Sequence, residues 1–81
     1  MVNNGRIQAN NYLELYLKNI VNNSKVFSKN KINIESKNLN NKNEIVATGK
    51  AVINSDALEN DNTKGVIFSK DELNITSNKI S

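Results

Sequence analysis

The chain of 81 residues contains no cysteine, no histidine and no proline. Disulfide bonds and Cys/His zinc sites are therefore excluded, and so is every catalytic triad in which histidine is the base. Only three glycines are present, too few for a calcium-binding solenoid of nine-residue repeats rich in Gly and Asp.

Long hydrophobic runs are also missing. No apolar run approaches the 18 residues that indicate a membrane-spanning helix, and the residues after Met1 lack the charged start and apolar core of a signal peptide. We therefore expect no membrane insertion, and we expect any export signal to lie upstream of this segment. The length allows one domain at most, or a slice of a longer one.

The chain carries little excess charge of either sign, with 11 Lys/Arg against 8 Asp/Glu and a net charge of +3. The lysines are scattered singly, whereas nucleic-acid binders concentrate basic residues on one face with aromatic side chains between them. Nucleic acid is therefore not an expected partner. Asparagine is abundant, at 18 of 81 residues, which can indicate disorder or an AT-rich bacterial genome. The regular spacing of the apolar residues, described next, indicates a folded chain.

Aliphatic residues recur at intervals of 19, 19 and 22 residues, starting from Ile7. These four residues are the repeat starts, and three further sets of aliphatic residues lie six, eight and thirteen residues after each repeat start. Of these 16 positions, 15 are Ile, Leu or Val, in a chain that holds 21 such residues, so the pattern is not chance. The four columns are Ile7, Val26, Ile45 and Ile67; Leu13, Ile32, Ala51 and Leu73; Leu15, Ile34, Ile53 and Ile75; and Ile20, Leu39, Leu58 and Ile80.

Polar residues recur with the same period. Fifteen residues after the first three starts stand Asn22, Asn41 and Asn60, and we expect their amides to form a hydrogen-bonded ladder near the core. Two residues after each start comes a small residue, and four residues after comes a type that tolerates left-handed backbone or caps a turn. The small residues are Ala9, Ser28, Ala47 and Ser69, and the turn residues are Asn11, Asn30, Gly49 and Asp71.

Short strands that repeat every 19 residues predict an all-β fold, a parallel β-helix or β-solenoid of about four rungs of 19–22 residues. Apolar and polar residues alternate at residues 32–34 and 73–75, as in half-buried strands; a third short strand is expected near Leu39. Residues 12–21 could form a helical stripe, but the repeat assigns them to strands. The rungs are residues 5–23, 24–42, 43–64 and 65–81 of a single segment, with a loop at residues 61–64.

The repeats resemble those of filamentous haemagglutinins and of the long stalks of contact-dependent inhibition toxins. The family pattern is roughly Asn-x-Gly-x-Ile-x-Ser, a turn, Leu-x-Ile-x-Ala, then Leu-x-Asn. Residues 22–28 and 31–41 follow it, residues 5–9 and 65–69 match its opening, and residues 39–41 and 58–60 match its close. The chain departs from it where Ser24 and Asn43 replace the turn glycine and Ala51 replaces a core leucine.

The resemblance implies a right-handed β-helix exported by two-partner secretion from a Gram-negative-type bacterium. It implies a secreted or cell-surface protein, a structural shaft segment of an adhesin or haemagglutinin-like exoprotein, and a virulence role. It implies a fragment of a longer repeat protein, and no catalytic residues, cofactor or metal. The expected partner is a receptor on a host or neighbouring cell.

Two sharper functions compete with the shaft. An enzymatic β-helix needs converging carboxylates, and Glu35 and Asp56 occupy nearby offsets without a basic partner beside them. We therefore expect solvated charge rather than an enzyme. The alternative is a periplasmic lipopolysaccharide-transport protein of the open β-jellyroll type, because residues 47–53 look like its Ala-Thr-Gly-x-Val segment. That likeness occurs once, whereas the haemagglutinin likeness recurs in every rung.

Two surfaces of the expected coil could take a partner. Phe27, Val46 and Phe68, each one residue after a repeat start, should form an outward apolar stripe. The stripe is either covered, by a flanking segment or by Tyr12 or Tyr16, or it is a docking strip. The end rungs should expose strand edges and core, which favours self-association.

Overall fold

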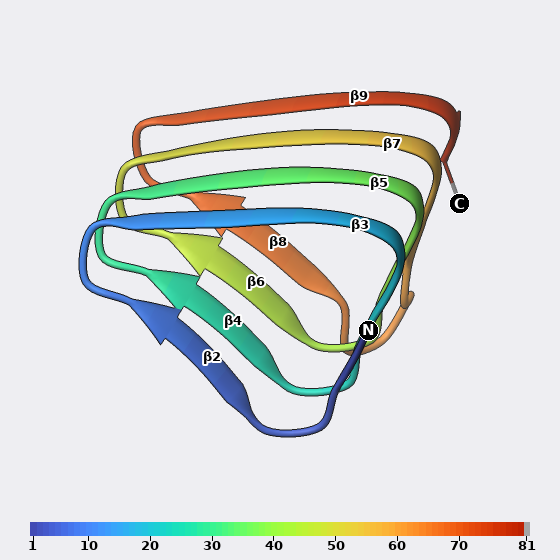
Figure 1. Cartoon of the computed structure of the whole chain (residues 1–81), viewed down its shortest axis with the longest axis horizontal. Coiled ribbons are helices and arrows are strands. Elements are labelled where there is room, and N and C mark those ends of the chain that lie inside the picture. The colour runs from blue at the N-terminus through green and yellow to red at the C-terminus, as the bar shows by residue number, and fades with distance from the viewer. Residues whose placement is uncertain (81) are drawn as a thin grey trace.

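The computed structural model describes residues 1–80, and within them the chain is all β. No helix of these residues is long and apolar enough to cross a membrane. Every pairing between neighbouring strands is parallel, and the coil makes about four rungs (Figure 1). The predicted β-solenoid is therefore confirmed. The strands are β1 (Val2–Asn3), β2 (Arg6–Ala9), β3 (Tyr12–Asn22), β4 (Lys25–Ser28), β5 (Lys31–Asn41), β6 (Glu44–Ala47), β7 (Lys50–Asn60), β8 (Val66–Ser69) and β9 (Glu72–Ile80).

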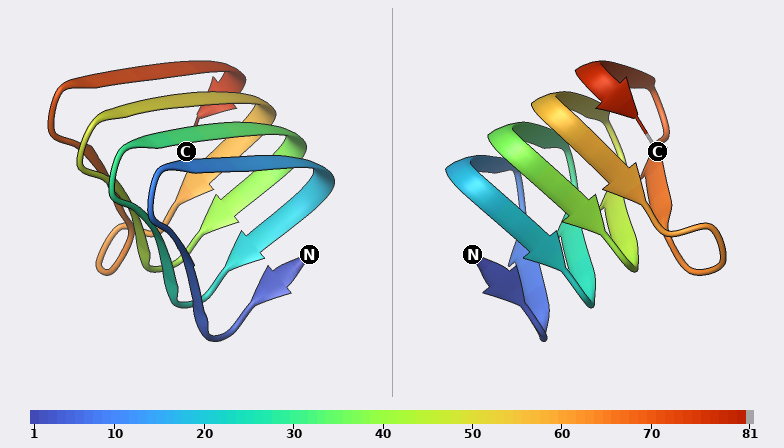
Figure 2. Two further views of the ribbon diagram at one scale, coloured as in Figure 1. Left: turned by 60° about the vertical axis from the view of Figure 1, so that its left-hand side comes forward. Right: turned by 90° about the vertical axis from the view of Figure 1, so that its right-hand side faces the viewer.

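Each rung contributes one short strand and one long strand, so the coil has two sheets. The short strands form the sheet β2-β4-β6-β8, and the long strands form the sheet β1-β3-β5-β7-β9. Figure 2 shows the rungs stacked along one axis, with equivalent strands directly over one another. The first rung consists of β2 and β3, the second of β4 and β5, the third of β6 and β7, and the fourth of β8 and β9.

The long strands turn a corner without ending, which differs from the three short strands per rung that the sequence suggested. β5 runs unbroken from Lys31 to Asn41, yet Lys37 has no register partner in β3 or β7. Inside the corner, the Ser55 hydroxyl donates to the carbonyl of Ala57 (2.8 Å), and its Oγ atom lies 3.3 Å from the carbonyl of Lys37. Because this side chain satisfies a carbonyl at the bend, the backbone can change direction and continue as strand.

The core consists of the predicted aliphatic columns. Strand register pairs every member of each column with its counterpart in the next rung. Full burial of one such side chain contributes roughly 1.5–3 kcal/mol, so the columns stabilise the central rungs most, whereas Leu73 and Ile80 in the fourth rung stay exposed. The buried apolar residues are Ile20, Val26, Ile32, Ile34, Leu39, Ile45, Ala47, Ala51, Ile53 and Leu58, each at most 3% exposed.

A ladder of asparagine side chains runs beside this core, as the sequence predicted. The Nδ2 atoms of Asn3, Asn22 and Asn41 each donate to the Oδ1 atom of the asparagine one rung later, at 2.9 Å, and the last acceptor is Asn60. Asn22 and Asn41 are 0% exposed, and their Nδ2 atoms also donate to backbone carbonyls. The ladder thus satisfies amides whose burial would otherwise cost about 1–3 kcal/mol each.

The sequence suggested that the turn residues either adopt left-handed backbone or cap the turn. The first expectation is wrong, because the turns between strands do not use left-handed backbone. Within residues 1–80 neither a glycine nor any other residue has a positive φ. Gly49 is required for space instead, because a Cβ atom there would lie 2.6 Å from both the carbonyl oxygen and the Oδ1 atom of Asn30. The close approach of two stacked turns therefore selects glycine at this position.

The extra residues of the third interval form a loop between β7 and β8 that projects from the coil (Figure 2), where the sequence placed it. Asp61 anchors the loop: its Oδ2 atom accepts hydrogen bonds from the backbone N–H of Lys64 (2.8 Å) and from the Thr63 hydroxyl (2.9 Å). These bonds, that from Lys64 foremost, lower the pKa of the Asp61 carboxyl below its ordinary value. The stack continues undisturbed beyond the loop.

Candidate docking surface

The outer face of the short-strand sheet carries the apolar stripe. Register places Gln8, Phe27, Val46 and Phe68 side by side on β2, β4, β6 and β8. Successive side chains of a strand point to opposite faces, so inward Val26 and Ile45 force Phe27 and Val46 outward. Phe27 and Val46 are half-buried by their neighbours, whereas Phe68 is 53% exposed. The stripe is therefore open to solvent most at its C-terminal end.

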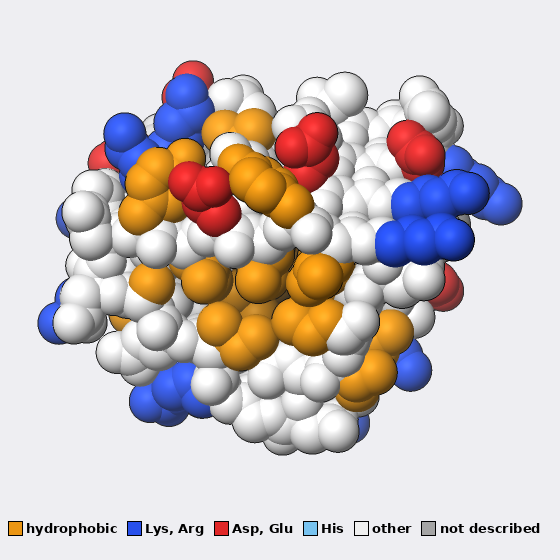
Figure 3. Space-filling model, viewed as in Figure 1, with side chains coloured by type: hydrophobic (Ala, Val, Ile, Leu, Met, Phe, Trp, Pro, Cys, Tyr) orange, Lys and Arg blue, Asp and Glu red, His pale blue; other side chains and the backbone are white. Residues whose placement is uncertain are grey.

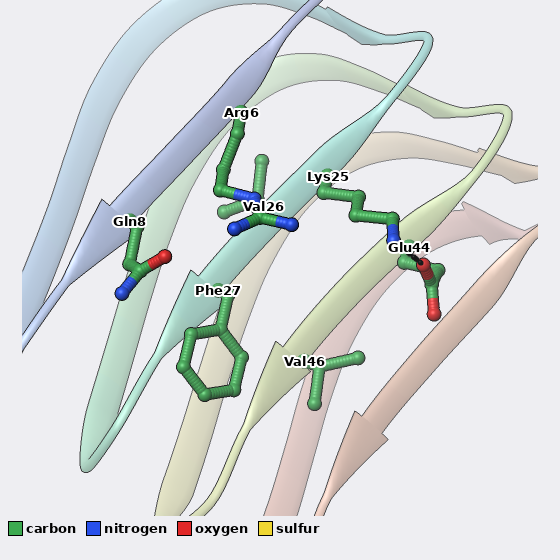
Figure 4. Close-up of a pocket in the computed structure, with 7 residues that line it drawn as sticks. All are labelled: Arg6, Gln8, Lys25, Val26, Phe27, Glu44 and Val46. Carbon is green, nitrogen blue, oxygen red and sulfur yellow. Dashed lines mark ion pairs between the residues drawn. The ribbon is translucent and has the colours of Figure 1, made fainter.

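A second outward column runs parallel to the stripe. This charged column consists of Arg6, Lys25, Glu44 and, at its end, the uncharged Val66; each stands two residues before Gln8 or a member of the stripe, and they are paired rung to rung. Lys25 and Glu44 form an ion pair of 3.6 Å, which is too exposed to contribute more than about 1 kcal/mol. A hollow of about 380 Å³ lies over β2, β4 and β6. Figure 4 shows Arg6, Lys25 and Glu44 along one side of it and Gln8, Phe27 and Val46 along the other.

The structure brings Phe27, Val46 and Phe68 together as the sequence predicted, on three adjacent strands. Tyr12 and Tyr16 lie on β3, in the other sheet, and neither lines the hollow. The charged column was not predicted as part of this surface. Its signal was available in the sequence, because the residue before each repeat start has the same outward orientation as the residue after it.

The carboxylates considered for catalysis lie on a different face. Glu35 and Asp56 line a shallow depression on the long-strand sheet together with Asn54 and Thr76. Among residues 1–80 no group of three or more His, Cys, Asp or Glu residues could hold a metal ion. The pKa of Tyr16, which lies outside this depression, is raised, chiefly by a hydrogen bond with Glu14. That the chain is not an enzyme and takes no cofactor stays a prediction.

Comparison with known proteins does not assign these surfaces to a family. No protein-family model, no curated protein and no solved structure matches the chain. Its function is therefore inferred from its own residues and their geometry.

Proposed function

We propose that this chain is a structural shaft segment of a secreted bacterial adhesin or haemagglutinin-like exoprotein, which mediates adhesion or presents a distal domain. One observation carries the proposal: four columns of like aliphatic residues run in register through every rung. A coil of this kind gains length by adding rungs, because each rung contacts only its neighbours.

The filled interior supports a shaft over a lipid carrier. A lipopolysaccharide-transport protein has to leave an apolar trough in which acyl chains lie. Ala47, Ala51 and Ile53, from the segment that resembles such proteins, are all 0% exposed. Their apolar surface is occupied by contacts within the chain itself, and none of it remains for an acyl chain.

The proposed location is the outside of a Gram-negative-type bacterial cell, and the proposed partner is a receptor on a host or neighbouring cell. A filled solenoid can contact a receptor only through its outer faces. The stripe of Phe27, Val46 and Phe68 is the candidate contact, because contiguous exposed apolar groups are a feature of interaction sites.

Labelling of intact cells tests the location. We expect an antibody raised against the folded chain to label intact cells that produce the full-length protein, under conditions in which an antibody to a cytoplasmic marker does not. Label that appears only after the outer membrane is permeabilised would contradict the proposal and favour the periplasmic lipid carrier.

A lipid titration tests the alternative function, that of a lipopolysaccharide carrier. We expect no saturable binding when a fluorescent fatty acid or labelled lipopolysaccharide is titrated into the purified chain. Saturable binding at a stoichiometry near one, lost when Ile53 is replaced by a polar residue of similar size, would overturn the shaft.

A further inference from the structure

The outer face of the short-strand sheet carries the charged column and the apolar stripe side by side. On the central strands β4 and β6, the charged column reads Lys25 and then Glu44, while the stripe reads Phe27 and then Val46. Figure 4 shows Lys25 and Glu44 directed toward each other, with Phe27 and Val46 on the same two strands. β4 and β6 each have a paired strand on both sides. This part of the face is therefore that of a continuous solenoid.

The outer face of the long-strand sheet mixes apolar and polar residues within each column. Val52, for example, stands between Asn33 and Asn74, and Val21 pairs with Asn40. Figure 3 shows acidic side chains between the hydrophobic ones over β3. Within residues 1–80, the continuous apolar column on an outer face therefore lies on the short-strand sheet.

The order of charges on the central strands is self-complementary. A two-fold axis parallel to the strands and midway between β4 and β6 turns a second copy over and reverses the order of its rungs. Lys25 then faces Glu44 of the second copy, and Glu44 faces its Lys25. The ion pair within each copy becomes part of a network of four alternating charges, and charges in a network contribute more than an isolated exposed pair.

The same rotation matches the stripe with itself. Phe27 lies over Val46 of the second copy, and Val46 lies over its Phe27. On the outer strands Arg6 faces the uncharged Val66, so no like charges meet along the charged column. A two-fold axis along the coil would instead lay charged groups over apolar ones. Because sheets packed face to face are turned by about 30°, the central strands stay aligned best and carry the contact.

We infer that the outer face of the short-strand sheet binds the same face of a second copy of this chain, with the two coil axes antiparallel. Four strands of four residues make a face of roughly 19 by 13 Å, from the usual strand spacing and rise. Two such faces bury less than the roughly 1,200 Å² of stable complexes, so the dimer is weak and exchanges readily. It covers the stripe that is the candidate receptor contact, so dimer and receptor complex exclude each other. The inference rests on the fold and not on the proposed function.

Analytical ultracentrifugation of the full chain tests the contact. A contact between identical faces closes at the dimer. We therefore expect the mean mass to rise with concentration toward twice the monomer mass of 9.0 kDa and not to exceed it. A chain that stays monomeric up to about 1 mM, or grows beyond the dimer, would overturn the inference.

Exchange of the two charges separates this face from any other contact. Lys25→Glu places two glutamates opposite each other, and Glu44→Lys places two lysines opposite each other, so each variant alone should lose about tenfold or more in dimer affinity. An equal mixture of the two variants should form a heterodimer, because each glutamate then faces a lysine of the other chain. Unchanged dimerisation of either variant, or a mixture that associates no better than its components, would contradict the inference.

Lys50→Glu is the matched control, because it makes the same change in charge and breaks an ion pair, that with Glu72 (3.0 Å), on the long-strand sheet. We expect it to dimerise as the unchanged chain does, and loss of its dimer would count against the short-strand face. Far-UV circular dichroism establishes that each variant is folded. The concentration series of the unchanged chain decides the inference even where a variant is not.

Discussion

Ile53 and Ile75 occupy the same column of the coil but not the same environment. Ile53, in the third rung, is 0% exposed, whereas Ile75, in the fourth, is only partly buried. Their side chains are identical and their strands pair directly. The difference comes from the number of stacked neighbours, because Ile53 has a rung on each side and Ile75 has one. The contribution of a side chain to the stability of this fold therefore depends more on its position in the stack than on its residue type.

The asparagine ladder shows the same contrast. Asn41 lies between two rungs and is 0% exposed, with its amide bonded to the asparagines before and after it. Asn60 accepts from Asn41 but donates only to the nearby Gly65 carbonyl. Solenoids differ from globular domains in this respect, since burial is supplied rung by rung. The central rungs should consequently tolerate substitution least.

Alanine substitution at Ile53 and Ile75 tests this contrast with the largest expected effect. Ile53→Ala should lower the free energy of unfolding by about 3–5 kcal/mol, because it leaves a cavity that both neighbouring rungs enclose. Ile75→Ala should cost about 1–2 kcal/mol, since solvent already reaches that side chain. Urea denaturation of both variants measures the two values. Equal losses would mean that the rungs are not stacked as described.

Breaking the buried ladder should have the next largest effect. Asn41→Ala should cost about 2–4 kcal/mol, because Asn60 loses its donor and Asn22 loses its acceptor in a buried setting. Asn38→Ala is the control: Asn38 also donates to an asparagine one rung away, Asn19, but in solvent. We expect that control to change stability by less than about 0.5 kcal/mol. Thermal or urea melts of the pair separate a buried ladder from a surface one.

The outer stripe should give the smallest effect. Phe68→Ser removes a side chain that is 53% exposed, so we expect the free energy of unfolding to change by no more than about 0.5 kcal/mol. A loss above about 2 kcal/mol would indicate that the stripe stabilises the fold itself, which would count against a docking role. The same urea denaturation series provides the measurement.

The columns of the core could be predicted because aliphatic residues recur at a fixed 19-residue spacing when equivalent positions stack over one another. The same spacing placed residues 12–21 in strand β3 in spite of their helical stripe. Asn3 was not predicted as the first member of the ladder, since it precedes Ile7, the first repeat start. The loop between β7 and β8 could be predicted from the interval between repeat starts. The third interval has 22 residues where the first two have 19, so three residues had to leave the stack.

The corner of the long strands could not be read from the sequence. Ser36 and Ser55 lie on the inner side of that corner, where Ser36 Oγ donates to Ser55 Oγ at 3.1 Å, but serine in a polar stretch signals only a turn. That residues 1–80 contain no left-handed backbone could not be predicted for a similar reason. Asn and Gly are compatible with it, and only the contact between Gly49 and Asn30 reveals that space selects the residue.

Disulfide trapping tests the stacking most directly, because the chain has no cysteine of its own. Ser36 and Ser55 are register partners on adjacent rungs, and Ser77 follows one rung later. Strands one rung apart lie about 4.8 Å from each other, within the span of a disulfide, whereas two rungs exceed its limit of about 7 Å between Cα atoms. In dilute solution, the Ser36→Cys/Ser55→Cys double variant should oxidise to an intramolecular disulfide, read by mass spectrometry, while Ser36→Cys/Ser77→Cys should not. Ready cross-linking of the second pair, or none in the first, would contradict the 19-residue stack.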